Sequence, residues 1–225
     1  MPELYEIYQN IKSEIDEKEK MCQIVWDLGD NEIFLKLIFS LCTPQTNAQY
    51  AWDAVKILSE SGYLHQAIHN EVEKQQRIIQ ISQILSNTKV RFKKNKSKYI
   101  VQAIQRFNSG FPFKTFLINQ LKNSKDIFEL RNWLAKNIYG MGMKEASHFL
   151  RNIGLGQNVC ILDRHILRNL EEYGVIERIP QNLSKKIYLQ IEQEMIKFSK
   201  EINIPVFALD YVFWYKSKGE LFNLK

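Results

Sequence analysis

IYGMGMKEASHFLRNIGLGQNVCILD, residues 138–163, is the most informative stretch of this chain. A helix is expected to end at Ile138, and a new one to begin at about Met143, with Gly140 and Gly142 bracketing one residue between them. Glycines at this spacing let the backbone turn tightly and approach a phosphate closely. The start of the new helix presents unpaired N–H groups, which suit a phosphate oxygen. The pattern is typical of a helix-hairpin-helix that holds a DNA backbone, although a plain helix connection also uses glycine.

Lys144 occupies the first turn of the new helix, where the helix dipole disfavours a cation by a few tenths to about 1 kcal/mol. It lies off the apolar face, and its neighbours along the helix surface are Ser147, His148 and Arg151. We therefore expect it to point towards a groove. Such a lysine indicates an amine nucleophile, made neutral by desolvation or by neighbouring positive charge. A lysine that contacts phosphate or is simply solvated is the alternative.

Asp163 follows Lys144 by 19 residues and precedes the expected helix RHILRNLEEY. An aspartate in this position commonly caps a helix. A capping carboxylate stays ionised, so it can also stabilise a sugar cation or accept a proton from an amine. Both interpretations require the same geometry, and spacing alone favours the cap.

The composition favours a helical protein of ordinary globular character. Hydrophobic residues make up 45% of the 225 residues, and only nine glycines and five prolines interrupt the chain. Apolar periodicity predicts helices over 3–20, 32–42, 48–61, 72–86, 99–107 and 125–138. The basic segment 89–98 and the segment 107–115 are expected to be irregular, and Val159–Leu162 is the only stretch rich in β-formers. We predict an all-α fold of roughly ten helices.

Charge and cysteine usage narrow the function classes. Lys and Arg number 31 against 25 acidic residues, a net charge of +6 that suits a polyanionic partner without requiring one. We expect Lys93, Lys94, Lys96 and Lys98 to form a solvated run that also attracts phosphates. Three scattered cysteines predict free thiols in a reducing compartment, not disulfides or a zinc site. The polar N-terminus and the lack of a long apolar run predict a soluble, cytoplasmic protein.

The pattern of Gly140, Gly142, Lys144 and Asp163 resembles the helix-hairpin-helix DNA glycosylase superfamily. The tail LDYVFWYKSKGELFNLK resembles the compact, archaeal-type family of 8-oxoguanine DNA glycosylase/lyases within it. No four-cysteine iron–sulfur signature is present, which agrees with the compact family. The resemblance implies two helical lobes with a DNA-binding cleft between them. Residues 1–30 with 145–225 would form the terminal lobe, and residues 31–144 the central lobe that ends in the hairpin at 138–144.

The resemblance also implies a bifunctional glycosylase and abasic-site lyase. Lys144 would attack C1′ of the damaged nucleotide with support from Asp163. Further residues follow from similar segments: Gln45, or less strongly Asn47, would fill the hole left by the extruded base, and His165 would reach a phosphate. The base would meet Lys225 with its free carboxylate, Trp214 and Phe92. Asp210 would either meet the same pocket or face solvent, and Phe92 and Trp214 are also candidates for ordinary core.

The expected partner is duplex DNA that contains 8-oxoguanine, bound by a monomer near the nucleoid, with no membrane, cofactor or catalytic metal involved. Two other functions stay open. A glycosylase/lyase for oxidised pyrimidines would use the same residues. A non-catalytic hairpin module would bind DNA in a salt-sensitive manner without cleaving it.

Overall fold

The computed structural model describes residues 2–107 and 112–221, and this part of the chain is helical with no strand. The first six helices are α1 (Pro2–Leu28), α2 (Asp30–Cys42), α3 (Ala48–Glu60), α4 (Glu71–Asn87), α5 (Lys93–Phe107) and α6 (Phe113–Asn123). The other five are α7 (Ile127–Asn137), α8 (Met143–Asn152), α9 (Arg164–Glu172), α10 (Lys185–Glu201) and α11 (Val206–Lys218). No helix among them combines the length and apolar character of a membrane span.

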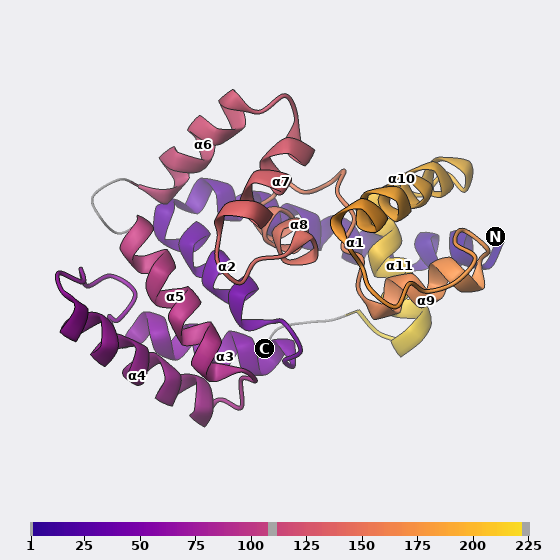
Figure 1. Ribbon diagram of the computed structural model, residues 1–225. Coiled ribbons are helices and arrows are strands. Elements are labelled where there is room, and N and C mark those ends of the chain that lie inside the picture. The colour runs from indigo at the N-terminus through magenta and orange to yellow at the C-terminus, as the bar shows by residue number, and fades with distance from the viewer. Residues whose placement is uncertain (1, 108–111, 222–225) are drawn as a thin grey trace.

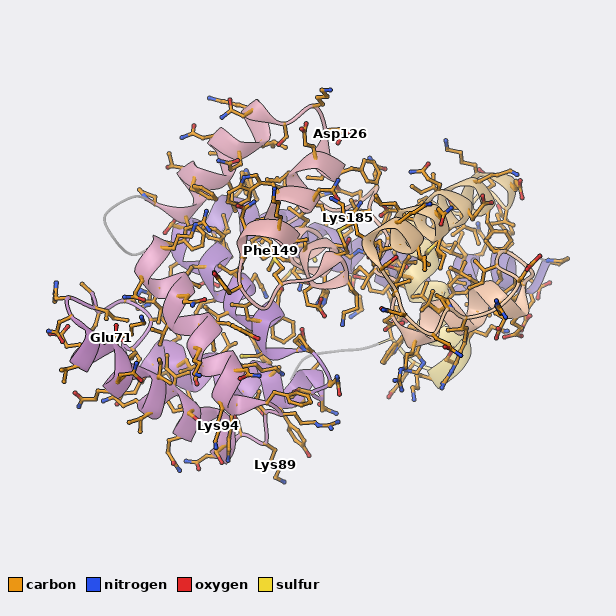
Figure 2. The ribbon with its side chains drawn as sticks, viewed as in Figure 1. Glu71, Lys89, Lys94, Asp126, Phe149 and Lys185 are labelled. Atoms are coloured by element: carbon orange, nitrogen blue, oxygen red, sulfur yellow. The ribbon has the colours of Figure 1, made fainter. Side chains whose placement is uncertain are left out.

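The helices pack around two hydrophobic clusters, which appear as two groups in Figure 1. The larger cluster is built from α2 to α8, and the smaller from α9 to α11. Helix α1 belongs to both, because Leu4 lies in the smaller cluster and Val25 in the larger. Phe149 of α8 packs inside the larger cluster (Figure 2). The predicted lobe boundaries at residues 30 and 144 stay a prediction, although this packing places the buried face of α8 with the central helices.

Two predicted irregular segments are partly helical. Helix α5 begins at Lys93, within the basic segment, because Lys96, Ile100 and Phe107 share its buried face. Helix α6 begins at Phe113, and its buried residues Phe113 and Leu117 cover the larger cluster. Apolar periodicity therefore missed helical residues in both segments, because polar residues interrupt the apolar pattern there.

The stretch Val159–Leu162, which is rich in β-formers, forms no strand, so β-structure there was a wrong expectation. Backbone groups of Cys160 and Leu162 pair with side chains of α10 in place of a neighbouring strand. Glu192 accepts the Cys160 N–H at 3.0 Å, and the Tyr188 hydroxyl donates to the Cys160 carbonyl at 2.6 Å. Apolar β-formers mark burial here, since β-propensity acts only where a partner strand exists.

Candidate active site

The hairpin between α7 and α8 turns at Gly140. Its φ of 81° lies in the left-handed region, and a Cβ there would stand 2.2 Å from the Tyr99 ring. Glycine is therefore required by both backbone and packing. Gly142 differs, because its φ of −91° is open to any residue. The prediction of a tight turn with α8 starting at Met143 is confirmed, but only one glycine supplies the unusual backbone angle.

Glu145 occupies the start of α8, where the sequence predicted a phosphate. Its Oε2 accepts the Gly142 N–H at 3.2 Å, and its Oε1 lies 3.0 Å from the Lys144 ammonium. An acid at the third helical position often reaches back in this way, and that spacing was the signal available in the sequence. A DNA phosphate at the Gly142 amide would compete with the Glu145 carboxylate for the same donor.

The Lys144 side chain is 32% exposed, so it is partly accessible from solvent. Its helix neighbours Ser147 and Arg151 were expected to lie with it on a polar, open face. That expectation was wrong in part, because both side chains are buried in contacts with other elements. Ser147 lies 3.3 Å from the Tyr188 hydroxyl of α10. Beyond its first turn α8 is mostly buried and packs against other elements, with His148 and Asn152 half-buried.

Asp163 caps α9, as predicted. Its Oδ1 accepts the backbone N–H groups of His165 at 2.8 Å and Ile166 at 2.9 Å. The carboxylate is partly exposed, and its other oxygen makes no hydrogen bond to those amides. One carboxylate oxygen thus fixes the side chain, while the second can face a reacting sugar.

A buried polar network missed by sequence reasoning stands behind both α8 and the segment before Asp163. Arg131 of α7 pairs with both carboxylate oxygens of Glu192 at 2.7 Å, and both side chains are fully buried. Arg131 also lies 3.4 Å from the Ser147 hydroxyl, and the Tyr188 hydroxyl meets the Leu162 N–H at 3.4 Å. These contacts tie α7, α8, α10 and the 160–162 segment into one rigid unit.

Asp210 is buried, so the alternative that it faces solvent is wrong. It pairs with Arg151 of α8 at 2.5 Å. Burial raises the pKa of Asp210 to about 6, the Arg151 guanidinium opposes this, and the nearby Asp163 carboxylate adds to the rise. Its predicted contact with the substrate stays a prediction, and in the structure it links α11 to α8.

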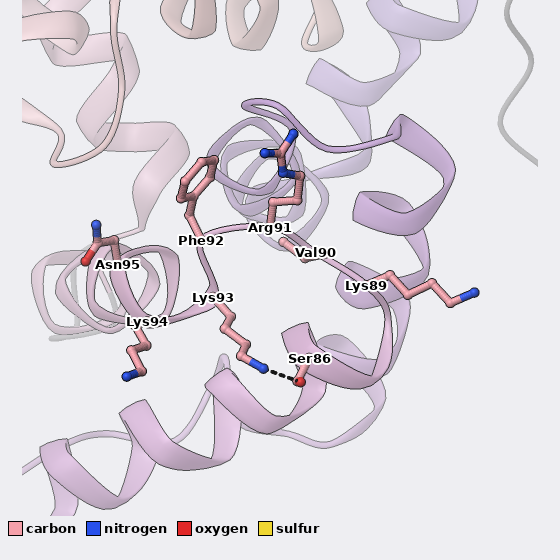
Figure 3. A pocket seen from close by; sticks show the side chains of 8 residues that line it. All are labelled: Ser86, Lys89, Val90, Arg91, Phe92, Lys93, Lys94 and Asn95. Carbon is pink, nitrogen blue, oxygen red and sulfur yellow. Dashed lines mark hydrogen bonds between the residues drawn. The ribbon is translucent and has the colours of Figure 1, made fainter.

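The two predicted stacking aromatics stand in different settings. The Trp214 ring lies edge-on to the His165 ring, with 5.2 Å between centroids, so these two candidates are brought together. Phe92 is 51% exposed and lies on the wall of a pocket of about 630 Å³ formed by residues 86 and 89–95. In Figure 3 its ring and the Arg91 side chain point to the same side of the loop. Lys225 lies outside the described residues.

Gln45 and Asn47 lie in the short loop between α2 and α3. Gln45 is exposed and has a φ of 52°, an unusual angle for a residue with a side chain. Asn47 caps α3 by accepting the Gln49 N–H at 2.8 Å, so it has a structural task. Lys96, expected to be solvated, is only 3% exposed and hydrogen-bonds to this loop.

The candidate residues form two neighbouring sets. Lys144 has Glu145, Lys96 and His148 as electrostatic or ion-pair neighbours. The Asp163 carboxylate raises the pKa of Asp210, and Asp163 precedes His165, whose ring contacts the Trp214 ring. Helix α8 links the sets, because it carries Lys144 at one end and the partner of Asp210 at the other. The direct pairing of Lys144 with Asp163 stays a prediction.

Comparison with known proteins shows the family to which this chain belongs. A family model described as 8-oxoguanine DNA glycosylase matches residues 12–204. The 8-oxoguanine DNA glycosylase/AP lyase of Fusobacterium nucleatum is 38% identical over 222 residues, which cover 98% of this chain and 96% of that relative. The protein of the same name from Methanocaldococcus jannaschii is 32% identical over 218 residues, covering 94% and 92%.

Solved structures resemble the chain over nearly its whole length. The M. jannaschii 8-oxoguanine glycosylase/lyase in complex with a 15mer DNA containing 8-oxoguanine matches with a TM-score of 0.82 at 30% identity, covering 99% of this chain and 98% of that one. The 8-oxoguanine DNA glycosylase of Thermotoga maritima matches with a TM-score of 0.81 at 26% identity, covering 99% and 97%. The predicted all-helical fold and the predicted family resemblance are both confirmed.

Proposed function

Because this chain belongs to the 8-oxoguanine DNA glycosylase family, we propose that it excises 8-oxoguanine from duplex DNA and then cleaves the strand at the abasic site. The observation that carries the proposal is the partly exposed Lys144 amine in the first turn of α8, directly after the hairpin. A pure phosphate binder needs only backbone amides there. The lysine adds a nucleophile.

The chemistry begins with extrusion of the damaged nucleotide, since its C1′ is inaccessible inside the duplex. Gln45 enters the stack in its place, and the base stacks on Phe92 or Trp214, which contributes roughly 1–3 kcal/mol per base. Hairpin amides and basic side chains hold the backbone. Lys89 and Lys94 project from the outer edge of the larger group (Figure 2).

Lys144 in its neutral form attacks C1′, and the bond from C1′ to N9 breaks as the base leaves with the bonding electrons. Asp163 stabilises the positive charge that develops on the sugar and accepts the proton that the amine loses. Ring opening gives an imine between Lys144 and the deoxyribose. Removal of a C2′ proton then breaks the 3′ C–O bond by β-elimination, and water releases the lysine.

The experiment measures base release and strand cleavage separately on duplexes that contain 8-oxoguanine, thymine glycol or no lesion. We expect both products from the 8-oxoguanine duplex only. Activity confined to thymine glycol would move the substrate to oxidised pyrimidines. Salt-sensitive binding without base release from any duplex would indicate a non-catalytic module.

We also propose that the protein acts as a monomer on the nucleoid within the cytoplasm, since duplex DNA is its substrate. The proposed reaction uses side chains alone and needs no cofactor or metal. Analytical ultracentrifugation with and without a lesion duplex tests the stoichiometry. A complex of two protein chains per lesion would contradict it.

A further inference from the structure

Lys96 in α5 connects the two loops that carry Gln45 and Phe92. Its backbone N–H donates to the Phe92 carbonyl at 3.0 Å. Its ammonium reaches across to the other loop and donates to three oxygens there: Cys42 O at 2.7 Å, Pro44 O at 2.8 Å and Thr46 Oγ1 at 3.0 Å. These acceptors flank Gln45 on both sides, so one side chain determines the path of the loop.

Thr46 makes a second connection between the same loops. Its hydroxyl oxygen accepts the Arg91 backbone N–H at 3.1 Å in addition to the Lys96 ammonium. Arg91 immediately precedes Phe92, so the loop of the aromatic residue is bonded directly to the loop of the glutamine. A displacement of either loop would break contacts of the other.

Both loops hold a residue with a backbone angle that non-glycine residues rarely adopt. The φ angle is 52° at Gln45 and 57° at Phe92, and both side chains are exposed. Such angles cost free energy and persist only where the surroundings hold them in place. Here the surroundings are the hydrogen bonds of Lys96 and Thr46. These backbone angles direct the Gln45 amide and the Phe92 ring outwards from two adjoining loops.

The environment of Lys96 is costly for a charge. The side chain is 3% exposed, and within residues 2–107 and 112–221 no carboxylate lies at ion-pair distance from it. Burial lowers the pKa of Lys96 to about 8, so the ammonium form still predominates at pH 7. An apolar residue would fill such a site at lower cost, unless the three donated hydrogen bonds serve a purpose.

We propose that Lys96 is a positioning residue that sets Gln45 and Phe92 as one unit, so that filling of the DNA stack and capture of the extruded base occur together. The proposal rests on the proposed function, which gives the two exposed side chains their tasks. It assigns a role to a lysine that touches neither base nor sugar.

Two variants test the proposal. Lys96→Met removes the ammonium, and Thr46→Val removes the shared hydroxyl while keeping the shape of the side chain. Matched controls are Lys197→Met, whose side chain is 72% exposed, and the exposed Thr115→Val. Each protein is assayed for single-turnover excision from an 8-oxoguanine duplex and for cleavage of a pre-made abasic site in single-stranded DNA, which has no stack to fill.

We expect excision from the duplex to fall at least about tenfold in both variants, the scale of one hydrogen bond to a charged group. Single-strand cleavage should stay near the wild-type rate in Thr46→Val, which keeps the Lys96 ammonium beside Lys144. Equal losses on both substrates in Thr46→Val would show that these contacts are purely structural and overturn the proposal, as would unchanged excision. If Lys96→Met fails to fold, Thr46→Val decides alone. Failure of the wild type to excise 8-oxoguanine would instead refute the proposed function.

Discussion

The Arg131 guanidinium of α7 donates two parallel 2.7 Å hydrogen bonds to the Glu192 carboxylate of α10, and solvent reaches neither side chain. Such a fork fixes relative orientation as well as distance. Glu192 also accepts the Cys160 N–H, three residues before Asp163. The pair therefore lies between the helix that leads into the hairpin and the segment that leads into the predicted catalytic carboxylate.

Removal of one partner should leave a buried charge without compensation. We expect Glu192→Ala to lower the free energy of unfolding by about 3–5 kcal/mol. Glu201→Ala, which breaks a 4.0 Å surface pair with Lys197, should cost less than about 1 kcal/mol. Urea denaturation of both variants measures the difference. Similar small effects would show that the network contributes little to the fold.

Asp163 combines two tasks that substitution can separate. Asparagine caps helices as well as aspartate, so Asp163→Asn should keep the wild-type free energy of unfolding, while Asp163→Ala should lose about 1 kcal/mol. Both should lose base excision, because neither carries the negative charge that stabilises the sugar cation. Thermal unfolding and single-turnover excision check the two parts. Full excision by Asp163→Asn would restrict Asp163 to capping.

Gly140 is tested against a glycine of similar backbone angle. Gly174 has a φ of 70° with nothing within 4 Å of a built Cβ, whereas a Cβ at Gly140 would strike the Tyr99 ring. Gly174→Ala should cost about 1 kcal/mol from the left-handed angle alone. Gly140→Ala should cost more and also weaken DNA binding, measured by fluorescence anisotropy. Equal stabilities with unchanged binding would contradict the packing described for the hairpin.

His148 of α8 should make the fold less stable at acid pH. Burial lowers its pKa to about 3, and the charges of Lys144 and Arg151 add to the effect. Below pH 6.5 the unfolded chain binds a proton at His148 that the native state does not, so stability falls as pH drops from 6.5 towards 3, by at most about 1.4 kcal/mol per pH unit. His148→Phe should flatten this decline, measured as Tm against pH. An unchanged slope would assign the decline to other groups.

The raised pKa of Asp210 has the opposite effect on the stability of the fold over part of that pH range. Between pH 3.8 and about 6 the native state binds the Asp210 proton more tightly than the unfolded chain does, so this group stabilises the fold as pH falls. Asp210→Asn should therefore steepen the acid decline of Tm. A shallower decline would show that Asp210 remains charged beside Arg151.

The sequence was sufficient for features that local chemistry determines. Gly140 and the start of α8 followed from turn and helix signals, and the cap at Asp163 followed from residue type and position. The all-helical fold followed from periodicity and from the scarcity of glycine and proline. Each of these depends on residues close together in the chain, where physical rules act directly.

The features that could not be predicted from the sequence depend on contacts between segments far apart in the chain. Arg131 and Glu192 are 61 residues apart, and Lys96 reaches oxygens 50 to 54 residues away, so neither pairing leaves a local pattern. Lys96 did give one signal, because it shares a helical face with Ile100 and Ile104. A charge on an apolar stripe indicates a buried partner more often than solvent, and the basic residues around it obscured that.

Borohydride trapping on a duplex with 8-oxoguanine identifies the nucleophile, because reduction converts the imine into a permanent bond between protein and DNA. We expect a covalent adduct with the wild-type protein and none with Lys144→Gln. An adduct that persists undiminished in Lys144→Gln would contradict this expectation and assign the nucleophile to another amine.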